Sequence, residues 1–96
     1  MWRQGDLLIV KVDKIPGSAI KQETRILAEG EATGHMHELD KGDVYEKDGT
    51  LYFKVEENST TTLKHPEHGA VAFEPGTYKV IRQREYEPQG WRTVSD

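Results

Sequence analysis

The chain contains four histidines, and all of them fall in two close pairs. His35 and His37 form a His-x-His sequence, whereas His65 and His68 are separated by a proline and a glutamate. Residues i and i+2 of a strand point to the same side, so His35 and His37 share one face. Several buried imidazoles are unfavourable unless they find partners, and a shared cation satisfies neutral rings. The sequence therefore predicts one metal site with four candidate ligands: His35, His37, His65 and His68.

The residue types narrow the identity of the ion. The chain has no cysteine, so imidazole and carboxylate groups must hold any metal. Imidazole suits Zn, Fe, Ni and Cu better than Mg or Ca, and Zn and Fe are the first candidates here. Three histidine ligands would leave a position open for water or a substrate oxygen, whereas four would make a closed, structural site.

Simpler interpretations of these residues stay open. His68 precedes a glycine and fits an exposed turn, and His65 fits a strand end that makes one backbone hydrogen bond. Glu67, between the two, is a candidate general base or an ordinary turn glutamate. Glu38 and Glu46 are further carboxylates that could support a metal.

A second group of candidates lies near the C-terminus. In an unbroken strand over residues 77–86, one face carries Tyr78, Arg82 and Arg84 together with apolar residues. Arginines beside a metal could bind a carboxylate or phosphate group of a small anionic ligand or substrate. The alternative is that they pair with some of the 17 acidic residues on a solvated face.

The elements expected to position these residues are strands. The Asp48-Gly49 dipeptide suits a type I′ turn and predicts a hairpin that sets Val44 opposite Phe53 and Tyr45 opposite Tyr52. Other strands are expected within residues 5–12, 24–28, 60–65, 70–73, 77–86 and 91–94, and only residues 17–23 could form a helical turn. The fold class is therefore all-β, a small barrel or sandwich of seven or eight short, mainly antiparallel strands.

Length and charge limit the function classes. With 96 residues, the chain is expected to form one domain over residues 1–96. A net charge of −4 argues against non-specific nucleic-acid binding. No apolar stretch approaches the roughly 20 residues that span a bilayer, and no signal peptide is evident, so we expect a cytoplasmic protein without a membrane partner. A second copy of the chain is a candidate partner, because a core this small gains from association.

The chain resembles a family of short bacterial and phage-associated hypothetical proteins over residues 4–8, 27–37, 65–68 and 75–86. A more partial resemblance is to cupins, small β-barrels with an internal metal. His35 and His37 fit the opening of the first cupin motif, and His65 or His68 would be the later ligand. The glutamate of that motif would fall near Gly42, and the Pro-Gly pair follows the second histidine cluster instead of preceding it.

Two hypotheses about function follow. In the first, the protein is a metal-binding β domain, with the possibility of metal-dependent catalysis on a small anionic or oxygen-containing substrate. In the second, it is a non-catalytic phage or mobile-element accessory module, or a protein-interaction module, whose histidines are structural or incidental.

Overall fold

The computed structural model describes residues 1–29 and 34–82. Within these residues the chain forms ten short strands and no helix. The strands are β1 (Trp2–Gln4), β2 (Leu7–Val12), β3 (Ile20–Lys21), β4 (Ile26–Glu29), β5 (Met36–Leu39), β6 (Asp43–Lys47), β7 (Thr50–Val55), β8 (Thr61–Lys64), β9 (Val71–Phe73) and β10 (Gly76–Arg82). No helix in this part of the chain is long and apolar enough to cross a membrane.

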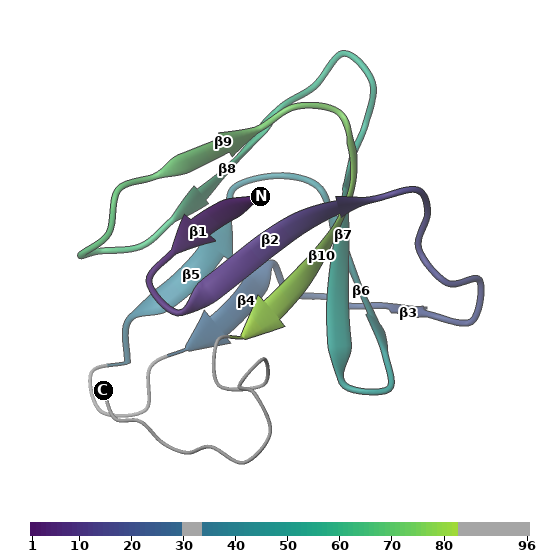
Figure 1. The fold of residues 1–96 in the computed structure, drawn as a ribbon, viewed down its shortest axis with the longest axis horizontal. Coiled ribbons are helices and arrows are strands. Elements are labelled where there is room, and N and C mark those ends of the chain that lie inside the picture. Colours follow the sequence, from purple (N-terminus) through teal and green to yellow (C-terminus); the bar gives the residue numbers. More distant parts are fainter. Residues whose placement is uncertain (30–33, 83–96) are drawn as a thin grey trace.

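The strands form two sheets, with the order β1-β2-β10-β7-β6-β3 in one and β4-β5-β8-β9 in the other. Every pairing is antiparallel. Figure 1 shows the smaller sheet lying across the larger one. Because the sheets do not close on each other, the all-β prediction is confirmed as a sandwich, and the barrel alternative is not observed.

The predicted hairpin is present with the predicted register. Strands β6 and β7 place Val44 opposite Phe53 and Tyr45 opposite Tyr52. Asp48 and Gly49 both have positive φ, at 51° and 83°. This is the backbone geometry that a type I′ turn requires. Local turn chemistry therefore determines this part of the larger sheet.

The core lies between the sheets and is closed by aromatic side chains. Phe53 and Tyr78 of the larger sheet and Phe73 of the smaller one pack together with ring centroids 4.9–5.2 Å apart. Trp2 covers this group, with its ring 5.3 Å from that of Phe73. Aliphatic residues from both sheets complete the core: Leu7, Ile9, Leu27, Leu39, Val44, Val55, Leu63 and Val80. Such burial is the main term that stabilises a domain of this size.

Two features differ from the expectation, and part of the expectation is not tested. Residues 17–23 contain no helical turn, because Ile20 and Lys21 instead extend the larger sheet by pairing with β6. Strand β1 was not expected, since three residues are too few to show a period. Strand β10 is described as far as Arg82, and the remainder of the strand expected over residues 77–86, together with the one over residues 91–94, lies outside the described residues.

Candidate functional site

The pairing of β5 with β8 brings the two histidine pairs together. In this pair Leu39 lies opposite Leu63 and both are buried, as the alternation along each strand requires. Continuing the same register two residues beyond that pair sets His37 opposite His65. Because both leucines point into the core, the two imidazoles point inward at the rim of the sandwich.

All four imidazole rings form one cluster. The His65 ring lies 4.4 Å from those of both His37 and His68. The rings of His37 and His68 are nearly parallel and 6.1 Å apart, and His35 lies 5.6 Å from His65. Two imidazoles that ligate one ion tetrahedrally have ring centres about 5 Å apart. The four rings therefore lie within one cluster at this rim of the sandwich.

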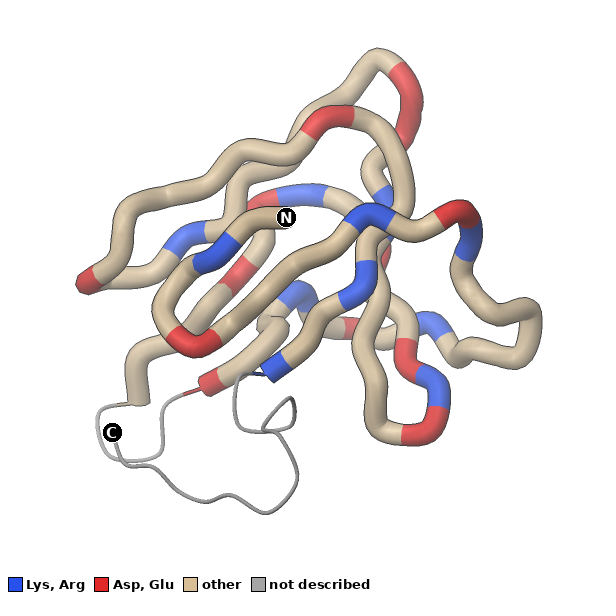
Figure 2. The backbone as a smooth tube through the Cα atoms, viewed as in Figure 1, with Lys and Arg blue, Asp and Glu red and all other residues tan. Residues whose placement is uncertain are grey.

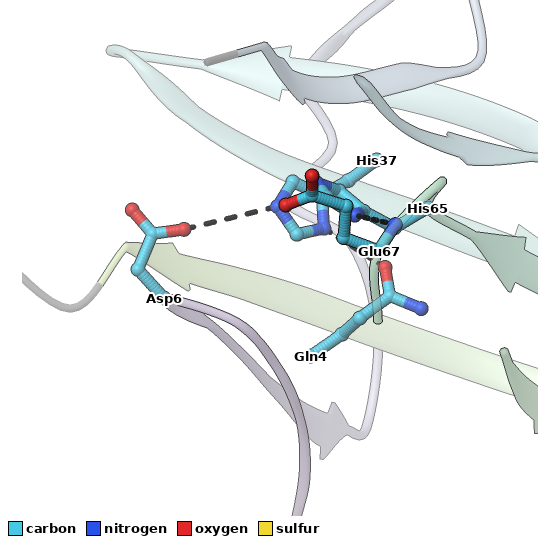
Figure 3. Close-up of polar contacts among 5 residues, drawn as sticks. All are labelled: Gln4, Asp6, His37, His65 and Glu67. Atoms are coloured by element: carbon cyan, nitrogen blue, oxygen red, sulfur yellow. Dashed lines mark hydrogen bonds and ion pairs between the residues drawn. The ribbon is translucent and has the colours of Figure 1, made fainter. Parts of the chain in front are cut away.

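The buried side chain of Gln4, at the end of β1, determines the tautomer of His37. The Gln4 Nε2 atom donates to the backbone oxygens of Leu63 and Gly69, both at 2.9 Å. This orients Gln4 Oε1 toward His37 Nδ1, 2.8 Å away (Figure 3). Since an amide oxygen only accepts, His37 Nδ1 must carry the proton. The neutral ring therefore presents a lone pair at Nε2.

The turn between β1 and β2 lies beside the Nε2 atom of His37. Asp6 Oδ1 lies 3.8 Å from His37 Nε2 (Figure 3). Gly5 has a φ of +61°, and a Cβ added to it would lie 2.8 Å from His68 Nε2 and 3.3 Å from His37 Cε1. Only glycine therefore fits here without displacing a ring.

The ring of His65 has the opposite hydrogen-bonding arrangement to that of His37. Its Nδ1 accepts a hydrogen bond of 3.0 Å from the backbone N–H of Glu67. A neutral ring that accepts at Nδ1 carries its proton on Nε2. To become a metal ligand, His65 must therefore release the Glu67 amide.

The four histidines line a pocket of about 340 Å³ together with charged side chains. Its walls come from the β1–β2 turn, the end of β4, the start of β5, the β8–β9 connection and the end of β10, which lie at one end of the sandwich (Figure 1). The lining residues are Asp6, Ala28, Glu29, His35, His37, His65, Glu67, His68 and Arg82. With neutral imidazoles, three carboxylates and one guanidinium leave a net charge of −2, which favours a cation.

Desolvation favours the neutral form of two of the rings. Desolvation lowers the pKa of His37 below its usual value of 6.5, and the neighbouring His65 lowers it further, while Asp6 opposes the shift. Desolvation, followed by the charges of His68 and His35, also lowers the pKa of His65. Neutral imidazole is the form that binds a metal.

These shifts predict an acid-sensitive fold. Below the unfolded pKa of about 6.5, the unfolded chain binds protons that the buried rings exclude. The free energy of unfolding of the metal-free protein should therefore fall as the pH is lowered from 7.5 to 5.5. Urea denaturation at these two pH values measures the change.

The Asp40 carboxylate does not contribute to this change between pH 7.5 and 5.5. Asp40 has a pKa below its usual 3.8, chiefly because the Thr62 N–H donates to it, so its stabilisation is lost only at lower pH. An equal or higher free energy of unfolding at pH 5.5 would contradict the account of buried neutral imidazoles.

The histidine cluster does not form a coordinating arrangement as it stands. No group of three or more His, Asp or Glu residues in ranges 1–29 and 34–82 is already placed to hold a metal ion. Two donors of a tetrahedral zinc site lie about 3.4 Å apart, whereas His37 Nε2 and Asp6 Oδ1 are 3.8 Å apart.

The remaining sequence candidates lie in different places. Glu67 lines the pocket, with its Oε2 3.7 Å from His35 Nδ1 and a side chain that is 66% exposed. Glu38 points to the opposite face of β5 from His37, and Glu46 lies in β6, outside the pocket.

The three candidates near the C-terminus also lie in different places. Arg82 lines the pocket. Tyr78 does not: it is buried in the core, where its hydroxyl donates to the backbone oxygen of Glu74 at 2.6 Å. Its position therefore gives no support to a role in substrate binding. Arg84 lies outside the described residues.

Sequence reasoning missed Gln4 and Asp6 as members of the site. Gln4 acts on groups 33 to 65 positions away, which no local pattern reveals. The one available signal is a polar residue directly before the Gly5 turn, where the chain begins its first long apolar strand.

The fold and the pocket define a small antiparallel β-sandwich with a histidine-rich cavity at one end. The chain belongs to a family described as a domain of unknown function, DUF8820, whose model matches residues 3–83. No curated protein and no solved structure matches the chain, so a relation to cupins is not shown.

Proposed function

We propose that this protein binds one divalent transition metal ion, Zn²⁺ or Fe²⁺, in the histidine pocket. His37, His65 and His68 supply the three closest imidazoles, and Asp6 and His35 lie at the edge of the same cluster. An open coordination position would make the site suitable for metal-dependent chemistry on an oxygen-containing substrate, with Glu67 as the nearest candidate general base.

The observation that carries the proposal is the hydrogen bond between Gln4 and His37. Metal-bound histidines typically donate their second ring nitrogen to a fixed acceptor, which sets the tautomer and orients the ring. Gln4 provides this acceptor, and its own amide is held by two backbone oxygens. His37 Nε2 is therefore oriented as a ligand before any ion arrives.

Two further features favour a cation. The pocket charge of −2 is neutralised by one divalent ion. The release of the Glu67 amide from His65 loses one hydrogen bond, a net cost of about 1 kcal/mol. The binding free energy of a histidine-rich zinc site far exceeds this cost.

A second candidate function is that of a non-catalytic module, for example a phage or mobile-element accessory protein, with incidental histidines. The bond from the Glu67 amide to His65 and the exposure of His68 favour it, because ordinary strand-end and turn histidines make such contacts. The two candidate functions predict different metal uptake.

Titration of the tag-free, metal-free protein with ZnCl₂ tests the proposal by calorimetry. We expect saturable uptake of one ion per chain. At free zinc 100 times the Kd, the fold should gain about 2.7 kcal/mol, which raises the Tm by roughly 10–20 °C for a domain of this size. Substoichiometric uptake with an unchanged Tm would favour the second candidate.

A further inference from the structure

Arg82 is the only arginine or lysine among the described residues that line the histidine pocket. It is the last residue of β10 and pairs with Leu7, the residue that follows Asp6. It shares a face of β10 with Tyr78 and Val80, both of which point into the core. Arg82 therefore extends from the end of the core into the pocket.

The guanidinium of Arg82 has no fixed partner within the described part of the chain. Its Nε atom is buried and makes no hydrogen bond there. Glu29, Asp6 and Glu67 line the same pocket, but no ion pair joins any of them to Arg82. A buried donor without an acceptor costs about 1–3 kcal/mol, so a ligand that supplies an acceptor is favoured here.

The charges around Arg82 limit what that ligand can be. Figure 2 shows acidic positions at the β1–β2 turn and at the end of β4, near the basic position that ends β10. In the metal-free pocket, the three carboxylates repel an anion. A divalent ion brings the net charge of the pocket from −2 to 0, and the ion and the guanidinium are then its two cationic groups.

We propose that Arg82 and a metal ion held by the histidine cluster together bind one small oxyanion, a carboxylate or a phosphate group. One anion oxygen ligates the metal, and another accepts hydrogen bonds from the guanidinium, which presents its donors in a fork that matches both groups. This inference rests on the proposed function, because the oxyanion is bound only after the cation. The pocket of about 340 Å³ has room for a small ligand.

The test uses the Co²⁺-loaded protein, whose visible spectrum reports changes in coordination. Acetate and methylphosphonate are titrated separately into wild type, Arg82→Gln and Arg82→Lys. We expect saturable spectral changes in wild type. The loss of a charge-assisted hydrogen bond should raise the Kd of the anion about 10–100-fold in Arg82→Gln, with a smaller increase in Arg82→Lys. The anion with the lower Kd identifies the group.

Lys79→Gln is the matched control, because it removes one positive charge from the opposite face of β10. It should leave anion binding unchanged, and no variant should bind Co²⁺ more weakly than wild type, because none of them removes a ligand or a negative charge from the pocket. Equal anion binding by wild type and Arg82→Gln would overturn the inference, as would equal binding with and without Co²⁺. Failure of wild type to bind Co²⁺ would instead remove the proposed function, and the oxyanion site with it.

Discussion

Replacing His37 with alanine should lower the affinity for Zn²⁺ by about 100-fold or more. Loss of a supporting partner of a metal ligand alone typically costs 10–100-fold, and this substitution removes the ligand itself. His37 is the imidazole whose tautomer is set by Gln4, and its Nε2 lies 3.8 Å from Asp6. Competition calorimetry against a chelator of known affinity measures the change.

Met36→Ala is the matched control for this variant. Met36 precedes His37 in β5 but points to the other face and is 36% exposed. The Met36→Ala protein should bind zinc with the same affinity as wild type. His65→Ala should lose less affinity than His37→Ala, because His65 must first give up the Glu67 amide. Wild-type affinity in a folded His37→Ala protein would mean that zinc binds elsewhere.

Gln4→Leu should weaken zinc binding by about 10–100-fold, although Gln4 touches no ion in the proposal. Without the acceptor on Nδ1, the His37 ring can rotate and exchange tautomers. The same change leaves the Leu63 oxygen, which is buried with the Gln4 amide, without its side-chain donor. The free energy of unfolding should therefore fall by about 1–3 kcal/mol, as urea denaturation of the metal-free protein would show.

Two further variants distinguish a role of Gln4 in positioning the His37 ring from a general loss of stability. Gln22→Leu removes a glutamine whose amide donates to the nearby Ile20 oxygen at an exposed site, so it should alter neither property. Gln4→Glu retains an acceptor for His37 Nδ1 and should keep more zinc affinity than Gln4→Leu, even if it is less stable. If both Gln4 variants bound zinc with wild-type affinity, the positioning role would be wrong.

The inward direction of His37 and His65 was predictable because it follows from strand periodicity. His37 shares a face with Leu39, and His65 shares one with Leu63, so two leucines paired in the core bring the imidazoles together. The Asp48-Gly49 hairpin was predictable for a related reason, since its register depends on local turn geometry.

The remaining features depend on contacts between distant segments. Periodicity places Tyr78 and Arg82 on one face of β10, yet it does not indicate where the second sheet ends. The structure buries Tyr78 beneath that sheet and leaves Arg82 at the rim, in the pocket. The tautomer of His37 depends on Gln4, 33 positions away in a three-residue strand without a recognisable pattern.

The most direct test of the central claim is an anomalous difference map at the zinc edge from a crystal of the tag-free protein grown with one equivalent of Zn²⁺. The proposal predicts one strong peak in the histidine pocket, about 2.0–2.1 Å from His37 Nε2, with at least one further ligand from His65 or His68. A pocket without a peak, in crystals that carry zinc at surface carboxylates, would contradict the claim.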